Sequence, residues 1–264
     1  MSIKKILTGY WNLLADSVIT SSMNTVIRNN SGEKIDYTFN DSGSETVVII
    51  GHGVTGNKDR PLVVALAEGL AASGMSVLRF SFSGNGNSEG RFVDSTITKE
   101  LADLKAVIDA VEAEGKRVIY AGHSMGVAVG VSVAAVDKRI QALISLAGMV
   151  NTKKFAETEF GEVAPDEGNM WDDEDCPLSQ IFMDDLRGIN TLIEKGSQVS
   201  VPWLLVHGTA DDVVLIDDTH DIFERAGQGK EKLIIEGSDH VFSDPVHMKA
   251  MVDGVLGWIR GINL

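Results

Sequence analysis

The stretch Arg117-Val-Ile-Tyr-Ala-Gly-His-Ser-Met-Gly126 decides how this chain is interpreted, and small apolar residues follow it as far as Ala135. In order, it contains a short apolar run, a Gly-x-Ser-x-Gly turn and the start of a helix. This order is typical of a sharp strand-to-helix turn that presents a nucleophilic serine, here Ser124. Side chains at Gly122 and Gly126 would collide with the neighbouring strand and helix, so glycine meets a steric demand at both positions.

The same pattern occurs a second time, in Gly86-Asn-Ser-Glu-Gly90. The residues before it, Ser83-Gly84-Asn85, form a predicted turn rather than a buried strand, and no helix of small residues follows directly. We therefore interpret Ser88 as a loop residue and retain Ser124 as the candidate nucleophile.

Composition limits the classes of protein that need to be considered. The chain has 264 residues, of which 44% are apolar, which suits one α/β domain with an insertion or two small domains. A net charge of −15 argues against nucleic-acid binding, because phosphate recognition needs a basic surface. Cys176 is the only cysteine, so no internal disulfide can form and a reducing compartment is expected.

The sequence predicts no membrane span, because no apolar run approaches the length of about 20 residues that a crossing helix needs. Lys4 and Lys5 precede Ile6 and Leu7, but polar residues interrupt the apolar region and no cleavage site is evident. We therefore expect a cytoplasmic protein. The oligomeric state cannot be inferred from these residues.

Apolar runs and helical periodicity alternate along most of the chain. Strands are predicted at 46–51, 77–82, 117–121, 140–146, 202–206 and 232–235, and helices at about 61–72, 97–111, 125–135, 217–226 and 245–259. Two further short strands are predicted within 23–40. Strands that alternate with helices predict an α/β fold with a mostly parallel sheet covered on both faces.

Two segments depart from this alternation. Ile3, Ile6, Leu7, Tyr10, Trp11 and Leu14 recur at helical spacing, which predicts an amphipathic helix that packs on the protein itself or serves as a lid, dimer contact or membrane-surface contact. After Gly148 the chain becomes acidic and irregular. We therefore expect core segments at 1–147 and 201–264 with an inserted cap at 148–200. The cap is too short to bury its aromatic and apolar residues in a core of its own, so some of them should face the site, while the acidic run 172–175 faces water. These residues are Phe155, Phe160, Trp171, Ile181 and Phe182.

A nucleophilic serine needs a general base and an acid to orient that base. Asp211 follows the predicted strand 202–206, and His240 follows the strand that ends near Ile235. Both therefore lie at the same sheet edge as Ser124. Asp212 is the rival acid and His247, in the last predicted helix, is the rival base.

The other histidines and the oxyanion donors can also be assigned. His52, His123 and His207 each adjoin a glycine at a strand end, where structural hydrogen bonding is expected, and His220 lies in a predicted helix. The backbone N–H groups of Met125 and Val54 are the expected oxyanion donors. No metal or cofactor is expected: the glycines near Gly84 do not match a dinucleotide fingerprint, and Cys176 lies where a thiolate is disfavoured.

Together, His52-Gly53, Ser83-Gly84-Asn85-Gly86, Gly122-His-Ser-Met-Gly126, His207-Gly-x-x-Asp211 and His240 resemble the α/β-hydrolase superfamily. The runs His52-Gly-Val-Thr-Gly-Asn57 and Phe80-Ser-Phe-Ser-Gly-Asn-Gly-Asn-Ser-Glu-Gly90 resemble its cinnamoyl (feruloyl) esterase branch. The resemblance implies a triad of Ser124, Asp211 and His240, in agreement with the residues chosen above. It also implies a cap that covers the site and helps to form an acyl pocket.

The resulting hypothesis is a serine hydrolase that cleaves small carboxylic esters, either aromatic (cinnamoyl-type) esters or esters of short to medium acyl chains. A lipase-like acylglycerol hydrolase, a thioesterase, a peptidase and a carbon–carbon bond hydrolase use the same triad, so these alternatives stay open. A different class is a non-catalytic binding protein built on the same fold.

Overall fold

The computed structural model describes residue 23 and residues 25–262, which form a sheet with strand order β1-β3-β2-β4-β5-β6-β7. Its strands are Tyr37–Asn40 (β1), Thr46–Gly51 (β2), Ser76–Phe80 (β3), Arg117–His123 (β4), Ile140–Leu146 (β5), Trp203–Gly208 (β6) and Lys230–Ile235 (β7). β1 pairs antiparallel with β3, and every other neighbouring pair in this sheet is parallel. The predicted fold class is confirmed.

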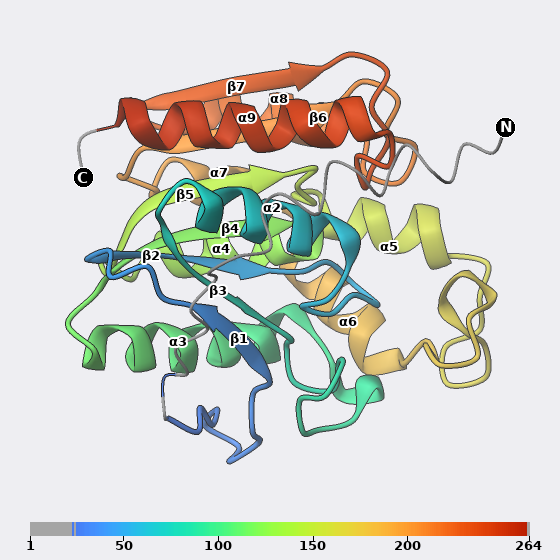
Figure 1. Cartoon of the computed structure of the whole chain (residues 1–264). Coiled ribbons are helices and arrows are strands. Elements are labelled where there is room, and N and C mark those ends of the chain that lie inside the picture. The colour runs from blue at the N-terminus through green and yellow to red at the C-terminus, as the bar shows by residue number, and fades with distance from the viewer. Residues whose placement is uncertain (1–22, 24, 263–264) are drawn as a thin grey trace, which may run out of the picture.

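Helices cover both faces of the sheet. They are Pro61–Ala72 (α2), Ile97–Ala113 (α3), Met125–Ala134 (α4), Asp217–Arg225 (α8) and Pro245–Gly261 (α9), with a short 3₁₀ helix at Phe92–Asp94 (η2). Figure 1 shows α2 and α9 on the near side of the sheet. These two helices share a hydrophobic cluster with one face of the sheet, and α3, α4 and α8 share a second cluster with the other face.

The strand β2 shows why the sheet is buried on both sides. Val47 and Ile49 belong to the cluster under α3 and α4, whereas Val48 and Ile50 belong to the cluster under α2 and α9. Successive side chains of a strand point to opposite faces, so an uninterrupted apolar run serves two cores at once. The β-branched run in the sequence is therefore explained by helices on both faces.

The N-terminal region differs from the expectation of two short strands within 23–40. β1 forms, but the earlier partner is a single bridge between Arg28 and Lys34 around the turn at 29–32. The Asn29 side chain accounts for this, because its Oδ1 accepts from the N–H groups of Ser31 and Glu33 and so closes a turn locally. The predicted helix around 3–14 lies outside the described residues.

The segment between β5 and β6 is helical, with Thr152–Phe160 (α5), Met170–Asp172 (η3), Gln180–Ile189 (α6) and Ile193–Gly196 (α7). The expectation that its aromatic rings lack a core was wrong for Phe155, Phe160 and Phe182, which are buried in the cluster that contains α3 and α4. These rings pack into the core between the sheet and its helices, whereas the expectation considered only the apolar residues within the segment itself. Trp171 and the acidic run 172–175 are exposed.

Within residue 23 and residues 25–262, no helix combines the length and the hydropathy that crossing a membrane requires.

Candidate active site

The turn from β4 into α4 holds Ser124 in an unusual backbone conformation, with φ 52° and ψ −117°. A Cβ atom on Gly122 would lie 2.5 Å from the carbonyl oxygen of Gly126, and one on Gly126 would lie 2.6 Å from the carbonyl oxygen of His52. Both clashes involve backbone atoms, which cannot move aside cheaply. The steric reason inferred for these two glycines therefore holds in the folded chain.

The hydroxyl of Ser124 is buried and has no hydrogen-bond partner among the described residues. Its backbone is fixed on both sides, since Ser124 N–H donates to the carbonyl oxygen of Leu146 at 3.0 Å and its own carbonyl accepts from Val127 and Met149. The backbone of the turn is therefore fixed, while the hydroxyl makes no hydrogen bond to His240 or to any other described residue.

Asp211 and His240 come together from the loops after β6 and β7. His240 Nδ1 lies 2.8 Å from Asp211 Oδ2, and Asp211 Oδ1 accepts from the backbone N–H groups of Val213 and Val214 at 3.0 and 2.9 Å. The rival carboxylate of Asp212 is exposed. The rival base His247 lies in α9, with no hydrogen bond to either aspartate in the described structure.

The environment of Asp211 keeps its carboxyl group ionised. Burial alone would raise its pKa, but hydrogen bonds from His207 and His240 outweigh burial and hold the pKa well below its usual range. An ionised carboxylate at Nδ1 of His240 fixes the proton on that nitrogen and leaves Nε2 available as a base.

His123, the residue before the candidate nucleophile, connects the elbow to the loop that carries His240. Its Nε2 donates to the carbonyl oxygen of His240 at 3.0 Å, and the two rings lie 4.8 Å apart between centroids. Burial, and then the neighbouring His240, lower the pKa of His123 to about 3, so its ring is neutral at pH 7. The contact ties the loop that carries His240 to the residue that precedes Ser124.

His52 holds the loop that carries Val54. Its Nε2 accepts from the N–H of Phe82 at 3.0 Å, so its Nδ1 carries the proton and donates to the carbonyl oxygen of Gly53 at 2.7 Å. Burial lowers the pKa of His52 to about 4, in keeping with a neutral ring. A Cβ on Gly53 would lie 2.8 Å from Cβ of Ser124, so glycine lets this loop approach the elbow closely.

The backbone N–H groups of Val54 and Met125 face no acceptor within the described residues, since neither donates a hydrogen bond there. Val54 follows Gly53 directly, and Met125 is the first residue of α4. The first N–H groups of a helix have no partner within it, so Met125 is suited to stabilise an anion.

Local sequence predicts the histidine contacts only in part. Structural hydrogen bonding was expected for His52, His123 and His207, and each ring has such bonds in the folded chain. The partner of His123 lies on a distant loop that approaches only when the strands pair, and the partners of His207 depend on how the chain after β6 folds back on its own strand. The one available signal is that each histidine adjoins a glycine at the carboxyl end of a strand.

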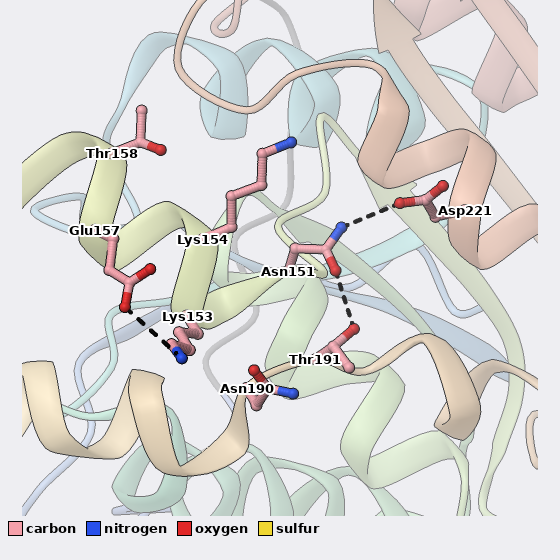
Figure 2. Close-up of a pocket in the computed structure, with 8 residues that line it drawn as sticks. All are labelled: Asn151, Lys153, Lys154, Glu157, Thr158, Asn190, Thr191 and Asp221. Atoms are coloured by element: carbon pink, nitrogen blue, oxygen red, sulfur yellow. Dashed lines mark hydrogen bonds and ion pairs between the residues drawn. The ribbon is translucent and has the colours of Figure 1, made fainter.

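A groove of about 440 Å³ lies away from these residues and is lined by Asn151, Lys153, Lys154, Glu157, Thr158, Asn190, Thr191 and Asp221. Figure 2 shows that its polar groups are largely paired with one another. The Asn151 amide bonds Thr191 and Asp221, and Lys153 pairs with Glu157 at 3.9 Å. It includes none of Ser124, Asp211 and His240, so we do not take this groove as the reaction site.

A smaller crevice of about 70 Å³ lies closer to the candidate site. It separates α5, at Phe155 and Thr158, from the residues 212–215 that follow Asp211. The crevice therefore adjoins the acid loop on the side where the inserted segment packs.

Comparison with known proteins agrees with an α/β-hydrolase fold. Residues 43–165, which include Ser124, match the family model described as serine aminopeptidase, S33. An uncharacterized protein of Mycobacterium tuberculosis is 23% identical over 248 residues, covering 91% of this chain and 80% of the relative. The bovine mitochondrial palmitoyl-protein thioesterase ABHD10 is 24% identical over 223 residues, covering 80% of this chain and 72% of the relative.

Among solved structures, Est1E from Butyrivibrio proteoclasticus with ferulic acid bound superimposes with a TM-score of 0.75 at 25% identity, covering 89% of this chain and 99% of Est1E. The chain therefore has the α/β-hydrolase fold, and both the family model and the superimposed structure are of hydrolases. The likeness to Est1E also agrees with the resemblance seen in the glycine-rich loops.

Proposed function

We propose that this protein hydrolyses carboxylic esters through an acyl-enzyme, with Ser124 as nucleophile, His240 as general base and Asp211 as the orienting acid. The observation that carries the proposal is the 2.8 Å contact between His240 Nδ1 and Asp211 Oδ2, on a loop tied to the elbow through His123. No other residue holds the Ser124 hydroxyl, and we propose that its hydrogen bond to His240 forms when substrate binds.

In the proposed reaction His240 Nε2 takes the hydroxyl proton while Oγ of Ser124 attacks the ester carbonyl carbon. The oxygen of that carbonyl becomes negative and accepts from the N–H groups of Val54 and Met125. His240 then protonates the leaving alcohol, and the acyl group remains on Ser124. Water, deprotonated by His240, releases the acid and restores the enzyme. These steps need no metal or organic cofactor.

We further propose aromatic (cinnamoyl-type) or short-to-medium acyl esters as substrates, supported by the likeness to Est1E, which was solved with ferulic acid. A thioester is the second candidate, since the bovine relative is a palmitoyl-protein thioesterase. Both substrates pass through the same acyl-enzyme, so the triad does not separate them.

The segment 148–200 is the proposed cap over this site. It leaves the sheet at the carboxyl end of β5, where ligands of open α/β sheets bind. Asp218 of α8 holds its start, because Oδ2 accepts from the N–H groups of Val150 and Asn151 at 2.7 and 2.9 Å. The crevice between α5 and residues 212–215 lies where this segment meets the acid loop.

A panel of substrates tests the proposal. It contains p-nitrophenyl esters of increasing acyl length, methyl ferulate, methyl caffeate, a palmitoyl thioester and an aminoacyl anilide, each with wild-type protein and Ser124→Ala. Ester turnover that Ser124→Ala abolishes would support the proposal. Turnover confined to the thioester would instead indicate a thioesterase, and turnover confined to the anilide a peptidase. A wild-type protein that cleaves none of them and resists a fluorophosphonate would be a non-catalytic binding protein.

A further inference from the structure

The candidate acid Asp211 has a second histidine on the oxygen that faces His240. His207, the last residue but one of β6, places Nε2 at 3.1 Å from Asp211 Oδ2. The same oxygen lies 2.8 Å from His240 Nδ1. The side chains of His207 and Asp211 are completely buried, so water does not compete for these contacts.

The partners of His207 determine where its proton lies. Nε2 faces Asp211 Oδ2 and, at 2.8 Å, the carbonyl oxygen of Val214, neither of which can donate. Nε2 therefore carries a proton, which it donates to the Val214 carbonyl, and Asp211 Oδ2 lies 3.1 Å from the same nitrogen. Nδ1 lies 2.7 Å from the Thr219 hydroxyl, which can donate to it and so strengthen Nε2–H as a donor.

We propose that His207 is a positioning residue of the triad, which orients the Asp211 carboxylate and limits how strongly that carboxylate holds a positive charge on His240. The orienting effect follows from geometry, since His207 fixes Oδ2 while Val213 and Val214 fix Oδ1. The second effect follows because the Nε2–H group, whose hydrogen carries partial positive charge, lies 3.1 Å from Oδ2 and offsets part of the negative charge that His240 meets there.

The two effects predict different results. An orienting role alone would lower turnover when His207 is replaced but would not change the pH at which His240 titrates. A charge-limiting role predicts that removing Nε2–H makes Oδ2 more negative toward His240, so His240 keeps its proton to higher pH. The proposal rests on the proposed function only in assigning Asp211 and His240 to a triad.

The test is a titration of ¹⁵N-histidine-labelled protein by NMR, comparing wild type, His207→Phe and His207→Gln, with the His240 signals assigned from His240→Gln. Phe fills the space without a donor, whereas the Gln amide keeps an N–H near the position of Nε2. We expect the midpoint for His240 to rise by about half a pH unit or more in His207→Phe. We expect it to stay near wild type in His207→Gln. No substrate is needed, so this result does not depend on ester hydrolysis.

Turnover gives the second readout. With a p-nitrophenyl ester, kcat of His207→Phe should fall about tenfold, the change expected for one lost hydrogen bond to a charged group. The acid limb of the plot of kcat/KM against pH should move to higher pH by the same amount as the NMR midpoint, because both report the enzyme without substrate. If His207→Phe does not fold, Thr219→Val removes only the donor to Nδ1 and should give a smaller shift in the same direction.

An unchanged His240 midpoint in a folded His207→Phe, or equal shifts in the Phe and Gln variants, would overturn the charge-limiting role. A wild type without ester turnover but with the predicted NMR shifts would instead reject the proposed function and leave the contact between His207 and Asp211 as described.

Discussion

Two regions of this chain carry Gly-x-Ser-x-Gly, and they differ in the hydrogen bonds of the serine hydroxyl and in the elements that flank the pattern. Ser88 lies in the loop between β3 and α3, where its hydroxyl donates to the carbonyl oxygen of Ser81 at 2.7 Å and accepts from Asp36 N–H at 2.8 Å. Ser124 lies between β4 and α4, and its hydroxyl has no partner among the described residues. One serine closes a loop, and the other is left available.

The difference lies in what flanks the pattern. Before Ser124 the strand β4 is buried between two neighbouring strands, and after it α4 packs on the sheet, so the turn has no room to relax. The glycines around Ser88 instead adopt positive φ, 55° at Gly86 and 100° at Gly90, and let the loop fold back on itself. Identical spacing thus serves a close approach in one region and a tight loop in the other.

The largest expected difference between the two regions is in activity. Ser124→Ala should lower kcat for a p-nitrophenyl ester by roughly 10⁴–10⁶ while leaving thermal unfolding nearly unchanged. Ser88→Ala should retain activity but lower the free energy of unfolding by about 1–3 kcal/mol, because Asp36 N–H and the Ser81 carbonyl lose a partner. Steady-state rates and urea denaturation measure both, and the reverse ranking would move the nucleophile to Ser88.

The next expected effect concerns the acid that serves Ser124. Asp211→Asn should lower kcat by about 10⁴, because the amide favours the wrong tautomer of His240 and cannot stabilise its positive form. The matched control is Asp212→Asn, which changes an exposed side chain and should stay near wild-type activity. Rates at several pH values compare the two, and greater damage from Asp212→Asn would contradict the contact described for Asp211.

Alanine substitutions of a glycine in each region should differ in their effects on both unfolding free energy and kcat. Gly122→Ala places Cβ against the backbone of Gly126, so we expect a loss of about 3 kcal/mol in unfolding free energy and a large fall in kcat. Gly90→Ala meets mainly the Glu33 side chain and strains a positive φ, so about 1–2 kcal/mol should be lost with kcat retained. Equal effects of the two variants on kcat would show that the elbow geometry is not special.

The smallest expected effect is a pH dependence of stability that originates in α3, the helix that follows the loop of Ser88. Glu100 in α3 is fully buried, and burial, then the charge of Asp103, raise its pKa well above its usual value. Glu100 therefore binds its proton more tightly in the folded state than in the unfolded chain, so its own contribution to stability is greatest at low pH and is lost as pH rises through the folded-state pKa.

Glu100→Gln removes this titration, since the amide stays neutral. Relative to wild type, the variant should gain about 1 kcal/mol in unfolding free energy between pH 5 and pH 8, with ester turnover unchanged. Urea denaturation at both pH values measures the difference. Parallel pH dependences in wild type and variant would show that Glu100 does not titrate in the folded state over this range.

Features that depend on a run of residues close together in the sequence could be predicted, whereas side-chain contacts that depend on packing could not. The elbow at Ser124, the parallel sheet and the loops of Asp211 and His240 were predictable, since each depends on a run of neighbouring residues. The burial of Phe155 depends on packing against distant helices. The contact of His207 with Asp211 depends on how the loop after β6 folds back on its own strand. Sequence patterns do not contain such side-chain geometry.

The most direct test of the central claim, that Ser124 and not Ser88 is the nucleophile, is labelling with a fluorophosphonate followed by mass spectrometry of the digested protein. A serine attacks this probe only when a base activates it, so the adduct marks the reactive hydroxyl. We predict one adduct, on the peptide that contains Ser124, and its loss in His240→Gln. An adduct on the peptide that contains Ser88, or labelling of Ser124 that does not need His240, would contradict the account.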